Sequence, residues 1–88
     1  MMPNPSVLIV DDDPGILEAL DRALRLEGFA VSTATDGEEA INTVGRDRPH
    51  VMVLDLGLPG ISGIEVIVRL RDDGQDLPIC VLSARDEI

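Results

Sequence analysis

The chain has 88 residues, 44% of them apolar, and a formal net charge of −10 at pH 7. This length allows one domain with a small core, and the apolar content excludes a disordered chain. The acidic balance argues against direct binding to nucleic acid or to an anionic membrane, and no apolar run approaches the roughly 20 residues that span a bilayer. The single cysteine excludes an intrachain disulfide and is typical of a cytoplasmic protein.

The first predicted element is a buried strand at residues 7–10, where four apolar residues follow one another. Three aspartates come directly after it. The last of them, Asp13, is predicted as the N-cap of a helix whose first residue is Pro14, since the first helical position needs no N–H. Apolar residues recur at helical spacing as far as Leu24, and Gly28 is predicted to follow the end of this helix.

A second strand and a second helix are predicted next. Residues 29–33 alternate between larger and smaller side chains, as in a short strand. Asp36 and Glu39 have the spacing of a capping box, which marks the beginning of a helix. This helix is expected to end at about Val44, because Gly45 follows.

The third predicted strand is again fully apolar, at residues 51–54, and it too is followed by an aspartate, Asp55. The loop GLPGISG comes next and leads into a third helix. The inner face of that helix is expected to consist of Ile64, Ile67 and Leu70, with Val66 alongside.

The fourth predicted strand is Ile79–Leu82, directly before Ser83, and Cys80 inside it is expected to be a small buried hydrophobic residue. Strands that alternate with short helices indicate βαβ units, so the chain is expected to have an α/β fold with a parallel sheet. Because parallel strands share one direction, Asp11, Asp55 and Ser83 are expected at one edge of that sheet. Ligands bind at this edge in open α/β sheets.

The aspartates at this edge need a partner, because like charges repel. Two unit charges about 4 Å apart interact by about 4 kcal/mol at an effective dielectric constant near 20. A hard divalent cation such as Mg²⁺ relieves the repulsion, and proteins hold Mg²⁺ with one or two carboxylates together with water and phosphate oxygens. An aspartate beside such an ion is a competent phosphoryl acceptor, and a nearby hydroxyl can donate a hydrogen bond to a phosphoryl oxygen.

Three motifs in this order and spacing, VDDDP, DLGLPGISG and LSA, resemble the receiver domain of two-component response regulators, and the resemblance covers essentially the whole chain. It implies a flavodoxin-like parallel sheet, here with the strand order 2-1-3-4. It also implies that Asp55 is the phospho-acceptor and that Ser83 is the switch hydroxyl, which moves toward the phosphoryl group. Mg²⁺ would be held by Asp12, Asp55 and the backbone carbonyl of Gly57. Asp11 would contact the ion through water.

The resemblance further implies partners and a cellular role. Members of this family receive the phosphoryl group from a sensor histidine kinase. Many members with a motif similar to LSAR control transcription through a winged-helix DNA-binding domain. The chain is therefore expected to be a cytoplasmic signalling module and not an enzyme. It is expected to act on DNA only through an effector domain outside this chain.

The sequence departs from the family in one residue type and in length. Receiver domains use a lysine at the end of a fifth strand to pair with the phosphoryl group, but all seven basic residues here are arginines. The chain ends at Ile88, before a fifth strand and a fifth helix. Residues 1–88 are therefore expected to form a truncated receiver domain, whose fourth strand is an exposed edge that promotes self-association.

Two other functions stay open from the sequence. Asp11-x-Asp13 after an apolar strand, with VLS at 81–83, resembles two motifs of haloacid-dehalogenase-type phosphatases, in which Asp11 would be the nucleophile and Asp13 the acid. Against this stand Gly15, where that motif usually has threonine or valine, the small size of the chain and the lack of lysine. The other alternative is an interaction module that keeps the receiver fold without being phosphorylated, which the lack of lysine favours.

Overall fold

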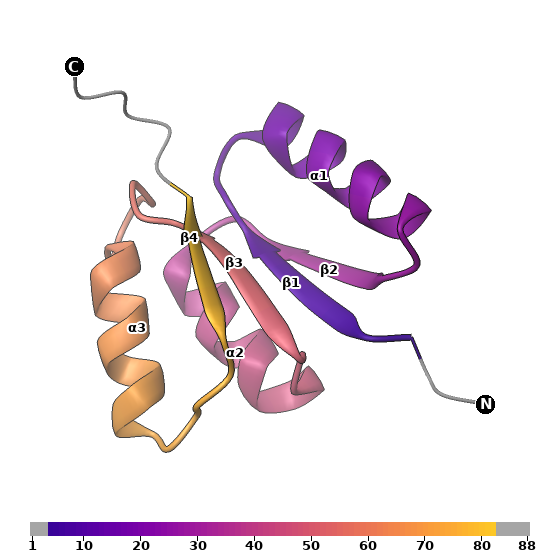
Figure 1. Ribbon diagram of the computed structural model, residues 1–88. Coiled ribbons are helices and arrows are strands. Elements are labelled where there is room, and N and C mark those ends of the chain that lie inside the picture. The colour runs from indigo at the N-terminus through magenta and orange to yellow at the C-terminus, as the bar shows by residue number, and fades with distance from the viewer. Residues whose placement is uncertain (1–3, 83–88) are drawn as a thin grey trace.

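The computed structural model describes residues 4–82, in which four strands alternate with three helices (Figure 1). The strands are β1 (Ser6–Val10), β2 (Ala30–Ala34), β3 (Val51–Asp55) and β4 (Ile79–Leu82), and the helices are α1 (Pro14–Leu26), α2 (Gly37–Asp47) and α3 (Gly63–Asp72). All neighbouring strands are parallel, in the order β2-β1-β3-β4. The predicted α/β fold and strand order are confirmed.

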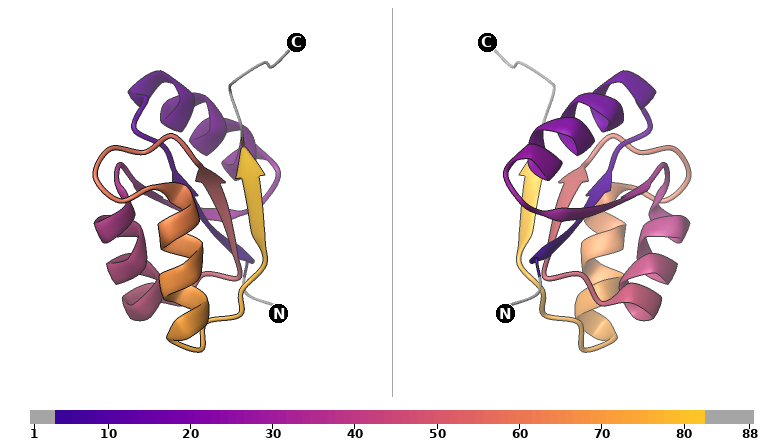
Figure 2. Two further views of the ribbon diagram at one scale, coloured as in Figure 1. Left: turned by 90° about the vertical axis from the view of Figure 1, so that its left-hand side faces the viewer. Right: turned by 90° about the vertical axis from the view of Figure 1, so that its right-hand side faces the viewer.

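Different helices cover the two faces of the sheet. α1 packs against β1 and β2 on one face, and α2 and α3 lie together on the other (Figure 2). Right-handed βαβ crossovers explain this division, because the chain moves from β1 to β2 in one direction across the sheet and from β2 to β3 and β4 in the other. The switch point of the fold therefore lies between β1 and β3.

The hydrophobic core lies between the sheet and the helices α2 and α3. The apolar runs predicted as buried strands form β1 and β3, the two central strands. α1 contributes no fully buried residue. The core consists of the following buried side chains: Leu8, Val10, Ala34, Ala40, Val44, Met52, Leu54, Leu58, Val66, Leu70 and Leu77.

The first helix begins and ends where the sequence predicts. The Asp13 carboxylate accepts hydrogen bonds from the backbone N–H groups of Gly15, at 2.8 Å, and Ile16, at 3.3 Å, as an N-cap does. Pro14 is the first residue of α1. Gly28 follows the helix with a φ of 97°, a left-handed conformation that favours glycine. Within the described part of the chain, no helix combines the length and apolarity needed to cross a membrane.

The second helix is longer than expected. α2 continues through Gly45 to Asp47 instead of ending at Val44. It stops at Arg48, which adopts a left-handed φ of 51° and donates its N–H to the Val44 carbonyl at 3.0 Å. The following Pro49 explains this ending, because proline disfavours the helical conformation in the residue before it.

Two predictions of burial are wrong. On α3 the fully buried side chains are Val66 and Leu70, one helical turn apart, whereas Ile64 is 58% exposed because it lies off that line. Cys80 is exposed. Its neighbour Ile79 packs against the core beside α2 and α3, so Cys80 points to the opposite face of the sheet, which α1 covers over β1 and β2.

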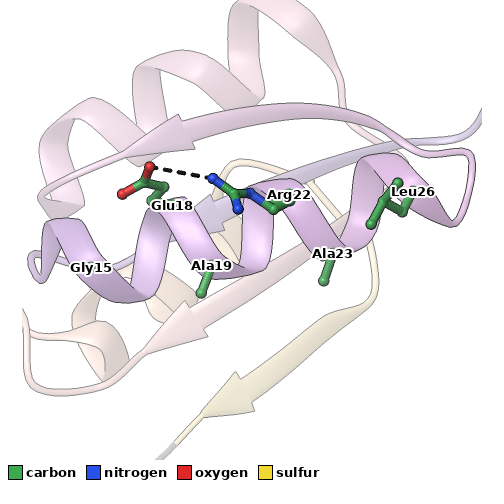
Figure 3. A pocket seen from close by; sticks show the side chains of 6 residues that line it. All are labelled: Gly15, Glu18, Ala19, Arg22, Ala23 and Leu26. Carbon is green, nitrogen blue, oxygen red and sulfur yellow. Dashed lines mark ion pairs between the residues drawn. The ribbon is translucent and has the colours of Figure 1, made fainter.

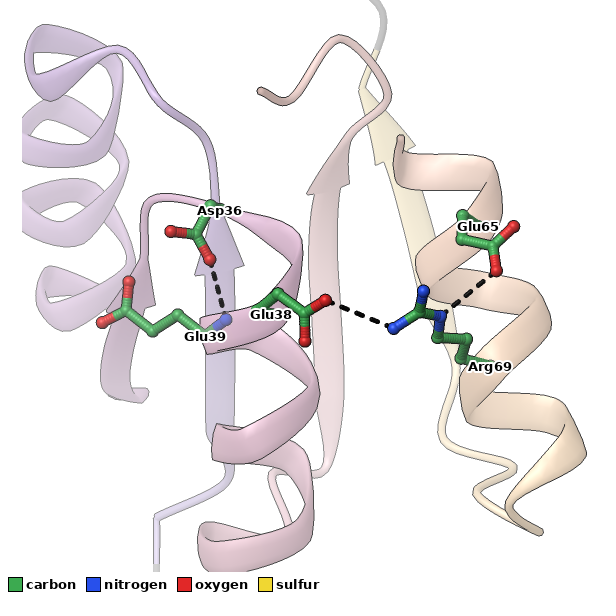
Figure 4. A network of polar contacts seen from close by, with 5 residues as sticks. All are labelled: Asp36, Glu38, Glu39, Glu65 and Arg69. Carbon is green, nitrogen blue, oxygen red and sulfur yellow. Dashed lines mark hydrogen bonds and ion pairs between the residues drawn. The ribbon is translucent and has the colours of Figure 1, made fainter. Parts of the chain in front are cut away.

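A network of polar contacts joins α2 to α3 (Figure 4). Arg69 of α3 donates hydrogen bonds to Glu65 on its own helix, at 3.2 Å, and to Glu38 on α2, at 3.3 Å. The Asp36 carboxylate accepts a hydrogen bond from the Glu39 N–H at 2.8 Å, which confirms the predicted beginning of α2. The side chains of the Arg69 network are largely exposed, so its ion pairs contribute little to stability.

Candidate functional site

Three carboxylates meet at the edge of the sheet where the strands end. Asp11 directly follows β1, Asp12 is the next residue, and Asp55 is the last residue of β3. Val10 pairs with Leu54, so the chain leaves the two adjacent strands at the same level. One carboxylate oxygen from each of the three aspartates lies within 4.8 Å of the others. The structure thus brings together, at the switch point, the three acidic residues that the sequence predicts as a metal site.

Hydrogen bonds hold the loop that follows β1. The Asp11 N–H donates to the Ala34 carbonyl at 3.1 Å, which extends the β1–β2 pairing by one residue. The Asp11 carboxylate accepts a hydrogen bond from the Asp13 N–H at 2.9 Å. The Asp13 carboxylate caps α1 and lies outside the group of three. The phosphatase alternative needs Asp13 as the acid, so this cap weighs against it.

Asp55 is half-buried, and its side chain is tied to the loop that follows β3. One of its carboxylate oxygens accepts a hydrogen bond from the Gly57 N–H at 3.1 Å. Leu58 is buried and anchors the loop in the core. At the other end of the loop, the Gly63 N–H donates to the Leu56 carbonyl at 3.2 Å. The loop is therefore fixed at both ends close to the carboxylate.

The carboxylate of Asp11 lies in an environment that disfavours a negative charge. The residue is only 4% exposed. Burial raises the pKa of Asp11 above the usual aspartate value, and the charges of Asp55, Asp12 and Asp13 raise it further. The hydrogen bond from the Asp13 N–H acts in the opposite direction. A cation beside the three carboxylates would favour the ionised form.

The donor set of this group suits Mg²⁺. Each member offers a carboxylate oxygen, the ligand type that hard divalent cations take. Asp12 is exposed and Asp55 is half-buried, so solvent reaches the group and can supply the water molecules that Mg²⁺ retains. The residues present therefore fit an Mg²⁺ ion.

The other predicted site residues have different outcomes. The Gly57 N–H bonds to Asp55, and the metal contact of the Gly57 carbonyl stays a prediction. Ser83 lies outside the described residues, so its role also stays a prediction. Gly63, the last residue of the GLPGISG segment, packs directly against the backbone of Asp55 and Leu56, a contact that the sequence does not predict. The close spacing of glycine and proline in GLPGISG was the available signal.

A groove of about 460 Å³ runs along α1 (Figure 3). Glu18 and Arg22 form an exposed ion pair on it at 3.8 Å. Leu26, at the far end, is 81% exposed. The groove is lined by Gly15, Glu18, Ala19, Arg22, Ala23 and Leu26. These residues offer no cluster of metal ligands, so the chemistry of the described residues is concentrated in the acidic group.

Comparison with known proteins places this geometry in a family. The chain matches the response regulator receiver domain over residues 7–88. It is 47% identical over 85 residues to the transcriptional regulatory protein PrrA of Mycobacterium tuberculosis, and 49% identical over 82 residues to the response regulator MprA of Mycobacterium leprae. These matches cover 97% and 93% of the chain but 36% of each relative. The chain thus spans about a third of the length of these curated relatives.

Solved structures share the fold. Response regulator protein TrrA from Thermotoga maritima, in complex with Mg²⁺-BeF, superposes with a TM-score of 0.87 at 38% identity, over 93% of this chain and 71% of that one. TrrA in complex with the histidine kinase ThkA gives a TM-score of 0.86 at 37% identity, over 94% of this chain and 72% of that one. Because both the sequence and the fold are shared, the chain belongs to the response regulator receiver domain family of two-component signal transduction.

Proposed function

We propose that this receiver domain accepts a phosphoryl group on Asp55 from a sensor histidine kinase. The observation that carries the proposal is the meeting of Asp11, Asp12 and Asp55, from two strands far apart in sequence, within 4.8 Å at one edge of the sheet. In the proposed reaction, a carboxylate oxygen of Asp55 attacks the phosphorus of a phosphohistidine. The new O–P bond forms as the N–P bond breaks, and the imidazole of the kinase leaves.

Each predicted residue of the acidic site has a proposed role. Mg²⁺ bound there would reduce the repulsion between the carboxylates and the incoming phosphoryl group. Asp12, Asp55 and the Gly57 carbonyl are the proposed ligands, and Asp11 is proposed to contact the ion through water. The hydrogen bond from the Gly57 N–H restrains the rotation of the Asp55 side chain and so orients the acceptor. Ser83 is the proposed switch hydroxyl.

The names of the similar proteins support the kinase and the transcriptional role. TrrA forms complexes with the histidine kinase ThkA and with Mg²⁺-BeF, and PrrA is a transcriptional regulatory protein. We propose the same kinds of partner for this chain in the cytoplasm. Its net charge of −10 disfavours contact with DNA, so we assign transcriptional control to an effector domain outside these residues.

Self-association through β4 is a further part of the proposal. Within residues 4–82, β4 pairs only with β3, so its outer edge has no neighbouring strand. Val81 on this strand is 44% exposed. An unpaired edge strand with apolar side chains presents N–H and C=O groups that a second chain can pair with.

Acetyl phosphate with Mg²⁺ tests the identity of the acceptor. Wild-type protein is expected to gain the mass of one phosphoryl group, and peptide mapping is expected to place it on Asp55. The variant Asp55→Asn should gain none, whereas Asp11→Asn should still be modified at Asp55. A phosphoryl group mapped to Asp11 would show that the phosphatase alternative is right and that this proposal is wrong.

The same experiment separates the interaction module from the phospho-acceptor. The chain has no lysine, and lysine is the residue that pairs with the phosphoryl group in this family. A protein that binds Mg²⁺ but forms no adduct with acetyl phosphate or beryllofluoride would be an interaction module. Asp55→Asn provides the matched background for both reagents, because asparagine keeps the size of the side chain and removes its nucleophilic charge.

A further inference from the structure

The first residue of α3 packs against the residue that carries the proposed acceptor. Gly63 is buried, and a Cβ atom added to it would lie 2.7 Å from the Leu56 Cα and 2.9 Å from the Asp55 carbonyl oxygen. It would also lie 2.9 Å from Cδ2 of Leu56. Real Cβ atoms almost never approach other atoms within 3.0 Å, so a side chain at position 63 requires movement.

The core fixes both segments that meet at this contact, the end of β3 and the helix α3. Leu54, one residue before Asp55, is fully buried and pairs with Val10 on one side and Val81 on the other. On α3, the buried side chains Val66 and Leu70 fix the helix to the core. Two of the three conflicts are with backbone atoms, which cannot rotate away as a side chain can. The movement therefore falls on the chain between Leu54 and Val66, which includes the Asp55 carboxylate and its bond to the Gly57 N–H.

Gly37 offers an instructive contrast. A Cβ atom added there would lie 2.5 Å from Cγ1 of Ile61 and 2.7 Å from Cγ2 of Val66. These conflicts are at least as close as those at Gly63, but they involve only side-chain atoms and no backbone atom. A methyl group at position 37 is therefore expected to disturb packing without moving the backbone of Asp55.

We propose that Gly63 is a positioning residue for the acidic site. The lack of a side chain lets α3 begin directly on the backbone of Asp55 and Leu56. This contact sets the path of the chain out of β3, and with it the directions of the Asp55 carboxylate and the Gly57 carbonyl. The proposal rests on the proposed function in one respect: the Asp55 carboxylate must be an Mg²⁺ ligand for Gly63 to affect metal binding.

The test compares matched glycine variants in one stabilised background. Gly45→Ala serves as this background, because Gly45 is an exposed helical residue with nothing within 4 Å of an added Cβ. Gly63→Ala, Gly37→Ala and the core variant Val44→Ala are each added to it. The measurements are the Mg²⁺ dissociation constant from calorimetry and the backbone ¹H–¹⁵N NMR shifts of the metal-free protein.

Gly63→Ala is expected to weaken Mg²⁺ binding by about tenfold, the lower end of the usual effect of residues that support metal ligands. The amide shifts of residues 55–57 should change in the same variant without metal. Gly37→Ala and Val44→Ala should lower stability and leave both the Mg²⁺ dissociation constant and the amide shifts of residues 55–57 unchanged. Unchanged amide shifts at residues 55–57 in Gly63→Ala would overturn the proposal, whatever the metal does.

Two further outcomes keep the conclusions separate. A background protein that binds no Mg²⁺ contradicts the proposed function, while the metal-free shifts still decide the role of Gly63. If Gly63→Ala does not fold, the double variant Gly63→Ala/Leu56→Ala removes the conflict with the Leu56 side chain and keeps both backbone conflicts. Mg²⁺ affinity in this double variant equal to that of Leu56→Ala would overturn the proposal. Affinity about tenfold lower would support it.

Discussion

Asp11 shows why the acidic group is unfavourable without a cation. The residue is 4% exposed, and carboxylate oxygens of Asp12 and Asp55 lie within 4.8 Å of its own. Burial disfavours its ionised form most, and the neighbouring charges add to this effect. A divalent ion turns repulsion into attraction, so we expect metal binding and folding stability to be coupled.

Asp12→Asn is expected to stabilise the metal-free protein and to remove its response to Mg²⁺. Asparagine keeps the shape of the side chain but removes one of three like charges and one anionic ligand. Wild-type protein should gain about 2.7 kcal/mol in free energy of unfolding when Mg²⁺ is present at about 100 times its Kd. Urea denaturation in EDTA and in excess Mg²⁺ measures both effects. Glu18→Gln, on α1, is the charge-matched control, and an equal Mg²⁺ response in Asp12→Asn and wild type contradicts the assignment.

Asp11→Asn is expected to remove part of the pH dependence of stability. Because folding raises the pKa of Asp11, the folded chain holds this proton more tightly than the unfolded chain does. The destabilisation from ionised Asp11 is therefore absent below the usual aspartate pKa and complete above the raised one. Urea denaturation in EDTA should show the largest stability gain of the variant at pH 7 and a smaller gain toward pH 4. A gain that is constant over this range contradicts the burial argument.

At the scale of the elements, sequence patterns predicted where helices and strands lie in residues 4–82, and they predicted the acidic site for a physical reason. The direction of parallel strands decides which edge their last residues occupy, so Asp11 and Asp55 had to share an edge once the sheet was parallel. The predicted end of α2 was wrong because glycine occurs both inside and after helices. Pro49, and not Gly45, ends this helix.

Contacts between elements could not be predicted in this way. The burial of Cys80 depends on how far α1 extends across its face of the sheet, which the sequence of β4 does not encode. The predicted inner face of α3 wrongly included Ile64 for the same reason. The contact of Gly63 with the Asp55 backbone depends on the path of a loop, so glycine content indicated a tight region without naming the partner.

Gly45→Ala is expected to stabilise the protein by about 0.5–1 kcal/mol, because alanine loses less conformational entropy than glycine in a helix. The position is exposed on α2, and an added Cβ meets nothing within 4 Å. Gly28→Ala is the matched control, since it also has open space but a φ of 97°, and it should destabilise the protein. Urea denaturation compares the two, and a loss of stability in Gly45→Ala contradicts the expectation.

At the scale of the whole molecule, the sheet is covered unevenly. α2 and α3 enclose the core on one face, while α1 packs over β1 and β2 on the other. Cys80 and Val81 are exposed on β4, the edge strand of the described residues. β4 therefore combines exposed apolar side chains with a strand edge that no other described strand pairs with, whereas the exposed apolar residues Leu26, Ile64 and Val68 lie on helices.

Val81→Lys is expected to reduce self-association, because lysine on an edge strand opposes pairing with another chain. Val68→Lys, on α3, is the control, since Val68 is 47% exposed and Val81 44%. Sedimentation velocity over a range of protein concentrations should show association in wild type and Val68→Lys, and a shift toward monomer in Val81→Lys. A wild-type protein that stays monomeric at high concentration contradicts association through β4.

The absence of a fully buried residue from α1 also has a consequence for motion. An element with few buried apolar contacts opens by local unfolding at low free energy, so the amide hydrogens of α1 should exchange with solvent before those of β1 and β3. The cap of this helix, Asp13, is hydrogen-bonded to Asp11 through its N–H. Occupation of the acidic site by Mg²⁺ should therefore slow amide exchange most in the first turn of α1. The exchange rate of this turn would then show whether the metal is bound.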